Sequence, residues 1–518
     1  MAVDTLTLAA VTVVYLAVTM ALGYLGYRHT KHAEDYMVAG RKMNPVILAL
    51  SYGATFISTS AIVGFGGMAA NYGMGLIWLT VFNIGAGILI AFLVFGKKTR
   101  EIGKRLGAVT FPDLMGKRFG SGFMQYASAA LIVIGMPLYT AAILIGGARF
   151  LETALALPYV TALVIFALIT AVYVVIGGLI AVMYTDALQG TIMLAGMTIL
   201  LVFTYMATGG VVHAHQALTD MAPLVPPALA NLGHTGWTSM PELGSVIWYT
   251  VITTLVLGVG IGVLAQPQLA VRFMTAKDAR TLNRAVLVGG PFILMMTGVA
   301  FTVGAVSNVY FYEHTGKIAT AAVTGGNVDL IIPTFIDMAM PSWFVVVFLI
   351  TLLAAAMSTL SSLFHTMGTA IGYDIWKHLA DQKPSLAANR VGIMVMILVS
   401  VALALVLPGS IIARATAMFM GLCASAFLPA FAYGMYAKEP SAAAAKASLL
   451  AGAAAWFLWT AFVHKAESSV MGLSQLLFGK PALLDFPWNV IDPLVIALPL
   501  SLLALTVVLV RERRAPSV

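Results

Sequence analysis

Long apolar stretches alternate with short polar ones along the whole chain. Each stretch approaches the roughly 20 apolar residues that a helix needs to cross a bilayer, so hydropathy predicts about 13 membrane-spanning segments. The pattern therefore predicts an all-α, multi-pass membrane protein without a soluble domain. The segments are expected to begin near Leu6, Val46, Gly75, Met124, Tyr159, Asp186, Ser245, Val286, Ser342, Arg390, Gly409, Ala444 and Val490.

Positive charge is distributed unevenly between the predicted loops. With the N-terminus outside and the C-terminus in the cytoplasm, the cytoplasmic loops hold 23 of the 28 Lys and Arg residues and the outer loops hold 5. The cytoplasmic stretches are 28–42, 97–118, 272–284, 377–390, 438–446 and 511–514. Short cytoplasmic loops of membrane proteins are enriched in Lys and Arg, so this split fixes the expected orientation. The net charge of +8 then follows from topology and indicates no nucleic-acid partner.

Composition agrees with this reading. Hydrophobic residues make up 60% of the chain and charged residues 9%, which is too little charge to cover a soluble protein of this length. The first segment, about Leu6 to Leu25, has no basic stretch before it, so we interpret it as a helix and not as a signal peptide. Cys423 is the only cysteine, which excludes structural disulfides and cysteine-bound metals.

Helix-breaking residues gather in two segments that lie five segments apart. The second segment contains Ser58-Thr59-Ser60 and then Gly64, Gly66 and Gly67, and the seventh contains Gly258, Gly260, Gly262 and Pro267. Interruptions at corresponding positions favour an inverted repeat whose broken helices frame a binding site in the middle of the membrane. Glycines that only allow close helix packing are the alternative explanation.

Polar side chains in spanning segments are costly and therefore suggest function. On the ninth segment, Ser358, Ser361, Ser362 and His365 share one helical face, with Thr359 beside it. Hydroxyls and freed backbone carbonyls are oxygen ligands suited to an alkali cation, although such a stripe also forms plain hydrogen bonds between helices. His365 could bind a solute or sense pH, or simply be a packed histidine.

Asp186 is expected at the start of the sixth segment, in the cytoplasmic half of the bundle. Three roles remain open for it. The carboxylate could neutralise a sodium ion, carry a proton, or cap the helix, since Asp is favoured at helix N-termini.

Several blocks of residues resemble the sodium:solute symporter family, in the right order from the first helix to at least Lys377. The resemblance rests on Glu34 to Arg41, Gly147 to Phe150, Ile176 to Gln189, Gln266-Pro267 with Arg272 to Met274, and Ala355 to Ser362. It implies a leucine-transporter-like fold of two inverted five-helix repeats in a single domain, residues 1–518. The expected parts are an extra N-terminal helix (about 5–27), a first repeat (45–210), a second repeat (244–436) and C-terminal helices (443–511).

The resemblance also implies a site. Carried over residue by residue, the main sodium site uses Ala54, Ile57, Ala355, Ser358 and Thr359, and a second sodium site uses Asp186, Ser361 and Ser362. The expected solute-binding residues are Phe56, Thr59, Ser60, Tyr139, Val259 and His365. Ser60 and Val259 stand where proline carriers have tryptophans, and Phe56 looks like the monocarboxylate branch of the family.

The sequence therefore predicts an inner-membrane, sodium-coupled symporter for a short monocarboxylate such as acetate, propionate, lactate or pyruvate, with proline or another small amino acid as the alternative. The expected partners are sodium, the solute and the lipid bilayer, with no other metal or cofactor and no obligate protein partner. A transporter-like membrane sensor and a proton-coupled carrier using Asp186 or His365 are the competing functions. An enzyme is not expected, because no facing acids, histidines or nucleophiles are apparent. The sequence leaves open the solute, the stoichiometry, the oligomeric state and the direction of flux.

Overall fold

The structure is a computed structural model of the 518-residue chain, and it describes residues 5–29, 33–174, 178–376 and 386–514. Within these ranges the protein is helical, and its one β-type contact is an isolated bridge between Met43 and Ala276. Ten described helices are long and apolar enough to cross a membrane, or up to twelve if each of two bent pairs counts as one span. The short helix α9 lies just below that length, so the predicted count of about 13 stays a prediction.

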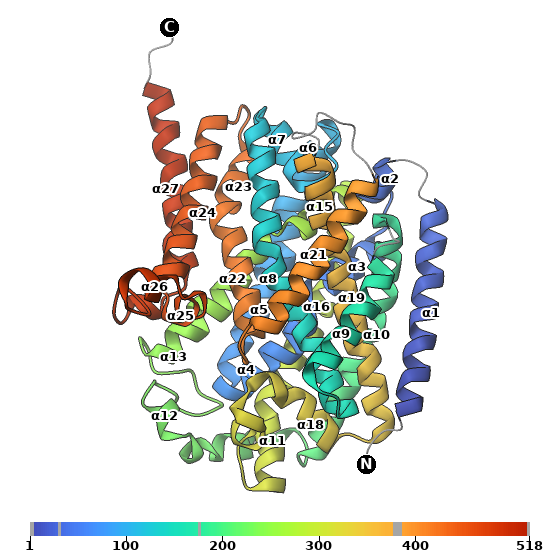
Figure 1. Cartoon of the computed structure of the whole chain (residues 1–518), viewed down its shortest axis with the longest axis vertical. Coiled ribbons are helices and arrows are strands. Elements are labelled where there is room, and N and C mark those ends of the chain that lie inside the picture. The colour runs from blue at the N-terminus through green and yellow to red at the C-terminus, as the bar shows by residue number, and fades with distance from the viewer. Residues whose placement is uncertain (1–4, 30–32, 175–177, 377–385, 515–518) are drawn as a thin grey trace.

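The longest helices run through the body of the bundle (Figure 1). They are α1 (Thr5–His29), α8 (Gly122–Leu155), α9 (Tyr159–Val174), α10 (Leu179–Ala207), α16 (Ala279–Thr315), α19 (Ser342–Thr369, continued by the π-helix η10, Ala370–Ile375), α21 (Leu386–Val406), α24 (Ala442–Phe462) and α27 (Pro493–Arg514).

Four further segments change helix type or direction along their length. They are α3 (Pro45–Phe56) with η2 (Ser60–Gly64) and α4 (Phe65–Tyr72); α5 (Ile77–Ile84) with η4 (Gly85–Gly96) and α6 (Lys97–Arg105); α13 (Val246–Tyr249) with η6 (Thr250–Gly258), α14 (Val259–Gly262), η7 (Val263–Ala265) and α15 (Pro267–Thr275); and α22 (Ile412–Ala426) with α23 (Leu428–Tyr436).

Short helices cover the two ends of the bundle. They are α2 (Ala33–Val38), η1 (Ala39–Arg41), η3 (Met74–Leu76), α7 (Phe111–Phe119), α11 (Val211–Asp220), η5 (Ala222–Leu224), α12 (Pro227–Ala230), α17 (Ala319–Ala322), η8 (Thr324–Gly326), η9 (Val328–Leu330), α18 (Ile331–Ala339), α25 (Lys465–Met471), α26 (Leu473–Phe478) and η11 (Trp488–Val490).

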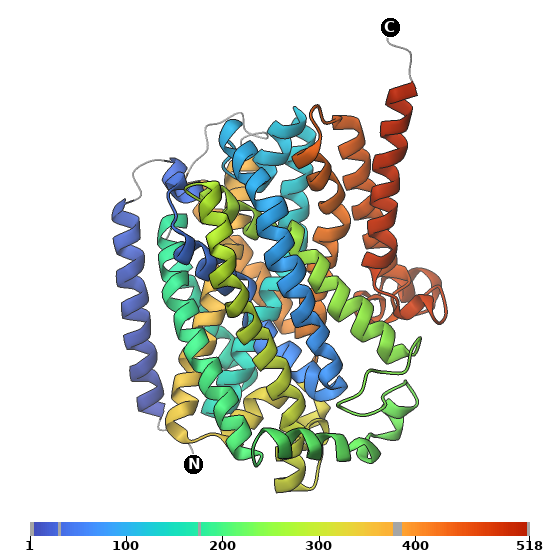
Figure 2. The ribbon, with the colours of Figure 1, turned by 180° about the vertical axis from the view of Figure 1, so that it is seen from behind.

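The two ends differ in which elements they carry. Helices α2, α6 and α7 and the C-terminal end of α27 lie at one end, which we call the inner end (Figure 1). Helices α11, α12 and α18 lie at the opposite, outer end together with the start of α1, and the reverse view shows the same division (Figure 2). The elements of the predicted basic loops thus share one end, as the charge argument requires.

The second predicted segment is broken where its hydroxyl residues lie. Helix α3 ends at Phe56, and Ile57 leaves the helix with an extended backbone (φ −91°, ψ 107°). The chain resumes as helix at Ser60, bent by 54° from α3. The interruption exposes the last carbonyls of α3, which have no partner in their own helix.

The seventh segment is interrupted at the last of its predicted helix-breaking residues, Pro267, and not at its glycines. Gly258 and Gly262 have helical backbone angles, and a Cβ on Gly262 would lie 2.5 Å from the Met420 carbonyl oxygen. These glycines therefore allow close approach of α14 and α22, which was the alternative explanation. The break lies at Gln266, whose backbone is extended (φ −68°, ψ 123°), and Pro267 then begins α15.

Gly67 offers a test of packing around the broken segment. A Cβ at this position in α4 would lie 2.1 Å from the backbone oxygen of Val328. We expect Gly67→Ala to lower the free energy of unfolding by about 1–3 kcal/mol, because backbone must move to make room. Gly85→Ala is the control, since no atom of the described residues lies within 4 Å of a Cβ built at Gly85. Melting temperatures of the purified variants that fall equally would contradict this packing.

Candidate functional site

The broken end of α3 lies against the hydroxyl stripe of α19. The Ser358 hydroxyl donates to the Ala54 carbonyl at 2.8 Å, and the Thr359 hydroxyl donates to the same oxygen at 3.2 Å. Both hydroxyls also reach the Ala355 carbonyl, at 3.2 and 3.1 Å. Four of the five residues predicted for the main sodium site thus meet in one place, and all are buried.

The local chain explains why these oxygens are available. Ala54 is in the last turn of α3, and the last backbone bond of that helix runs from Ile57 N–H to the Gly53 carbonyl. The Ala54 carbonyl therefore depends on donors from α19. The lone pairs of the Ala54 carbonyl and of the two hydroxyls could then coordinate a cation, as the oxygens of unwound helices coordinate sodium in transporters. Ile57, the fifth predicted ligand, forms the break itself.

Asp186 does not begin its helix, so the capping role considered from the sequence is wrong. Helix α10 begins at Leu179 after Gly178, which places Asp186 two turns inside it and fully buried. Its Oδ2 forms an ion pair of 2.8 Å with Arg272 Nη2. Arg272 was assigned to a cytoplasmic loop by the charge argument, but it is buried in α15 with 1% of its side chain exposed.

Hydroxyls from two more helices complete this buried network. The Ser51 hydroxyl donates to Asp186 Oδ2 at 2.8 Å and accepts from Arg272 Nε at 3.0 Å. Arg272 Nη2 donates to Ser362 Oγ at 2.5 Å, and Thr55 Oγ1 lies 3.1 Å from the same oxygen. The network thus joins α3, α10, α15 and α19 beside Ser358.

The predicted second sodium site is only partly assembled. Asp186 and Ser362 come together through Arg272, whereas the Ser361 hydroxyl donates to the Ser358 carbonyl at 3.1 Å. Within the part of the chain that the structure describes, Asp186 Oδ1 is buried without a hydrogen-bond partner. A free acceptor therefore remains on this carboxylate, next to a cation already supplied by the protein.

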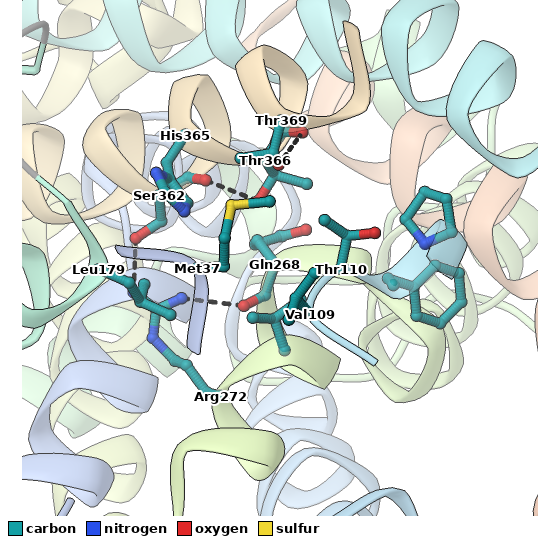
Figure 3. Close-up of a pocket in the computed structure, with 13 residues that line it drawn as sticks. Met37, Val109, Thr110, Leu179, Gln268, Arg272, Ser362, His365, Thr366 and Thr369 are labelled. Atoms are coloured by element: carbon teal, nitrogen blue, oxygen red, sulfur yellow. Dashed lines mark hydrogen bonds between the residues drawn. The ribbon is translucent and has the colours of Figure 1, made fainter. Parts of the chain in front are cut away.

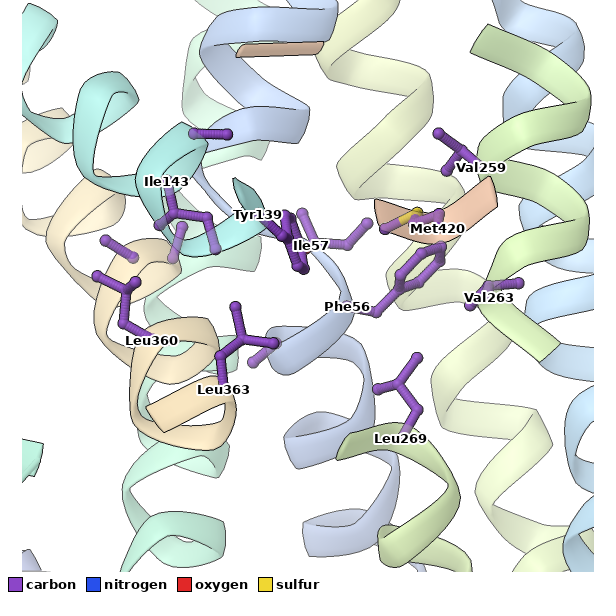
Figure 4. Packing of buried hydrophobic residues seen from close by; sticks show 14 of the residues in the cluster. Phe56, Ile57, Tyr139, Ile143, Val259, Val263, Leu269, Leu360, Leu363 and Met420 are labelled. Carbon is purple, nitrogen blue, oxygen red and sulfur yellow. The ribbon is translucent and has the colours of Figure 1, made fainter. Parts of the chain in front are cut away.

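A small central cavity of about 20 Å³ lies beside the break. It is large enough for about one water molecule. Its thirteen lining residues carry no charge, and they include the predicted solute residues Phe56, Tyr139 and Val259 (Figure 4). The lining residues are Phe56, Ile57, Ser58, Ala61, Phe65, Leu79, Asn83, Tyr139, Val259, Thr297, Phe301, Thr416 and Met420.

Three predicted solute residues do not line this cavity. The Thr59 hydroxyl is turned to the Ile143 carbonyl at 2.8 Å and ties the break to α8. Ser60 is buried in η2, and its hydroxyl has no partner among the described residues. His365 lies toward the inner end and lines a separate cavity of about 10 Å³ with Arg272, Gln268 and Ser362 (Figure 3).

Sequence reasoning missed Ser51, Thr55 and Arg272. Ser51 and Thr55 precede Thr59 at helical spacing, so the second segment carried the same kind of hydroxyl stripe that identified the ninth. Arg272 lay in a recognised block, but its charge suggested a loop position. Asn83, whose Oδ1 in the central cavity has no partner among the described residues, carried no sequence signal, because one Asn inside an apolar segment is not distinctive.

Comparisons with known proteins agree with this arrangement. Residues 36–452 match the sequence model of the sodium:solute symporter family. The chain is 28% identical to the sodium/pantothenate symporter of Haemophilus influenzae over 485 residues, covering 91% of this chain and 94% of that protein. It is 26% identical to the sodium/proline symporter of Escherichia coli over 456 residues, covering 87% of each chain.

The fold is also found in a solved structure. A Na⁺-coupled sialic acid symporter, captured in a substrate-bound outward-open state, superposes with a TM-score of 0.73 at 18% identity and covers 98% of both chains. The predicted leucine-transporter-like fold is thereby confirmed. Ile176 and Gly177, two residues of the recognised block before Gln189, lie outside the described residues.

The family match, the relatives over most of the chain, and the apolar helices lead to one conclusion. The protein is a multi-pass membrane transporter and not an enzyme. Its oxygen-rich contact between a broken helix and a hydroxyl stripe is consistent with sodium coupling. The chain belongs to the sodium:solute symporter family.

Proposed function

We propose that the protein couples the inward movement of sodium to the uptake of a short monocarboxylate. The observation that carries sodium coupling is the convergence of Ser358 and Thr359 on the Ala54 carbonyl, at 2.8 and 3.2 Å. Sodium at this point joins α3 to α19 and orders the break beside the central cavity. Solute then binds a site that sodium has pre-organised, which gives positive coupling between the two ligands.

The chemistry of the lining of the central cavity, rather than its present volume of about 20 Å³, supports a small solute. Its lining has apolar walls, hydroxyls from Ser58, Tyr139 and Thr416, and no charged side chain. The helical part that follows the break begins at Ser60, close to the cavity residues Ser58 and Ala61. Amides at a helix N-terminus favour a negative charge. The Ser60 and Ala61 amides donate to Ser58 in this structure, so a carboxylate would take the place of Ser58 as their acceptor and would need no fixed countercharge.

A small amino acid remains the second candidate. The chain is similar to sodium/proline symporters over most of its length, and this observation favours proline at least as much as a monocarboxylate. An amino acid also brings an ammonium group, which needs an acceptor in the cavity. The buried Oδ1 of Asn83, which has no partner among the described residues, is suited to that role.

Uptake into proteoliposomes separates the two candidates. We expect an inward sodium gradient to drive accumulation of labelled propionate, lactate or pyruvate, and unlabelled short monocarboxylates to compete with it. Saturable sodium-driven uptake of proline with no monocarboxylate uptake would replace the first candidate by the second. Pantothenate serves as a larger carboxylate, because a relative carries it.

Phe56 is expected to limit the size of the solute. Its ring is buried at the central cavity and lies opposite Val259 and Met420 (Figure 4). Phe56→Ala should lower the apparent affinity for propionate and raise it for longer monocarboxylates such as hexanoate, since each buried methylene contributes about 0.8 kcal/mol. Inhibition constants for an acid series measure this, and an unchanged order of preference would contradict the assignment.

The network around Asp186 allows two stoichiometries. Arg272 already places a positive charge on Asp186 Oδ2, which supports one sodium ion at Ser358 and Thr359. The free Oδ1 of the same carboxylate supports a second cation, either sodium or a proton. The ratio of sodium to solute flux in the same proteoliposomes distinguishes these cases.

A further inference from the structure

A second and larger cavity opens at the outer end of the bundle. It has a volume of about 720 Å³ and is lined by parts of α4, η6 and α22 and by the segment around α25. Lys465 and Ser469 on its wall are exposed, so the cavity reaches the surface. None of the residues predicted from the sequence for sodium or solute lines it.

The fixed positive charges on this wall come from Arg414 and Lys465. Arg414 is partly buried at the start of α22, and within the described residues its guanidinium makes no hydrogen bond and no ion pair within 4.0 Å. A guanidinium presents five donors in a planar fork that matches a carboxylate. An unpaired, half-buried arginine facing a cavity is therefore suited to an anionic ligand.

Acidic side chains near the outer end do not neutralise this wall. Among the described residues, no Asp or Glu lines the cavity. Glu467 is buried and turned to His464, and Asp329 is buried behind α22, where it accepts from the Ile411 amide at 3.2 Å. Asp329 attracts Arg414 only at longer range, because the two form no ion pair within 4.0 Å.

The outer cavity lies directly outside the central one, because α4 and α22 line both and η6 of the outer cavity runs straight into α14 of the central one. On α4, Met68 lines the outer cavity and Phe65 the central one, and on α22 these positions are Arg414 and Thr416. Thr254 of η6 lines the outer cavity five residues before Val259. These pairs are two to five residues apart, so roughly 3–8 Å along the helices separates the linings of the two cavities.

We propose that the outer cavity is a low-affinity binding site for the carboxylate of the incoming solute, held by Arg414 and steered by Lys465. This inference rests on the proposed function, since it requires an anionic solute. Low-dielectric walls focus the field of the two cations and raise the local concentration of the anion. The solute then passes between α4 and α22 to the uncharged central cavity.

Transport kinetics test the role of the two cations. We expect Arg414→Gln to raise the KM for propionate by about 10- to 100-fold, as for loss of a hydrogen bond to a charged group. Lys465→Gln should raise it about two- to five-fold, as for an exposed ion pair. The kcat of both variants should equal that of the wild type. Arg414→Lys keeps the positive charge, so its KM should lie close to the wild-type value. Added salt should raise the KM of the wild type more than that of the variants.

Lys480→Gln is the matched control, because Lys480 is exposed and does not line the cavity. An equal rise in KM in this variant, or unchanged KM in both Arg414→Gln and Lys465→Gln, would overturn the proposal. If Arg414→Gln fails to fold, Lys465→Gln still decides the outcome, because its side chain is exposed.

Cysteine labelling tests the charge of the cavity independently of transport. Cys423 is buried, so a cysteine introduced as Ser469→Cys on the cavity wall can be labelled selectively. The measured quantity is the ratio of the labelling rate with a negatively charged methanethiosulfonate to the rate with a positively charged one. This ratio should be higher for Ser469→Cys than for Ser239→Cys, which lies on an exposed outer loop. Adding Lys465→Gln to Ser469→Cys should lower the ratio. Equal rates with both reagents would refute the anion site. If the Ser469→Cys thiol prefers the negatively charged reagent but the protein takes up no monocarboxylate, only the proposed solute is refuted and the anion site stands.

Discussion

Sodium-driven uptake should be lost when Ser358 and Thr359 are both replaced by alanine. The two hydroxyls are the donors that hold the Ala54 carbonyl, and they supply two of the five expected sodium ligands. If each contributes as much as a hydrogen bond to a charged group, their joint removal weakens sodium binding by about 3–6 kcal/mol, or roughly 10²- to 10⁴-fold. Initial rates of uptake against sodium concentration measure the effect.

A matched control lies on the same helix. Thr351 is buried in α19 and donates to the Val347 carbonyl at 3.0 Å, away from the break in α3. Thr351→Ala makes the same chemical change and should keep the sodium dependence of the wild type. Normal sodium affinity in the Ser358→Ala, Thr359→Ala double variant, with the protein inserted and folded, would contradict the assignment.

The second large effect is expected at the buried ion pair. Asp186→Asn leaves the Arg272 guanidinium buried at 1% exposure without a countercharge. Breaking a buried pair from one side typically lowers the free energy of unfolding by about 3–5 kcal/mol, because one charge stays desolvated and unpaired. We expect a large drop in melting temperature, and a smaller drop when Arg272→Gln is added to the same chain.

An exposed ion pair provides the comparison. Lys98 and Glu101 are 3.4 Å apart at the inner end, with 43% and 60% of their side chains exposed. Glu101→Gln should change stability by about 1 kcal/mol at most. If Asp186→Asn and Glu101→Gln had equal, small effects, the buried network would not stabilise the fold as described.

Local signals in the sequence located the central contact. The polar run at Ser58 to Ser60 marked a real break, and helical spacing brought Ser358 and Thr359 to the face that meets Ala54. Both features depend on the residues of a single segment, whereas the pairing of Ala54 with Ser358 and Thr359 across two segments was predicted from the family resemblance. The ligand roles of these residues stay a prediction until sodium binding is measured.

Features that depend on tertiary contacts were not predictable in the same way. The glycines of the seventh segment were interpreted as a break, but they give room to neighbouring helices: Gly262 to Met420 and Gly260 to Phe82. Asp186 was expected at a helix start because the apolar turns before it were not assigned to that helix. Arg272 is inside the bundle because Asp186 neutralises it, and a count of loop charges cannot register a pair formed by distant segments.

The most direct test of the account is the cation dependence of uptake by the purified protein. Replacing external sodium by choline at fixed pH should abolish concentrative solute uptake in proteoliposomes, and an inward proton gradient should not restore it. Uptake that continues in choline and follows the proton gradient would contradict a sodium site between α3 and α19.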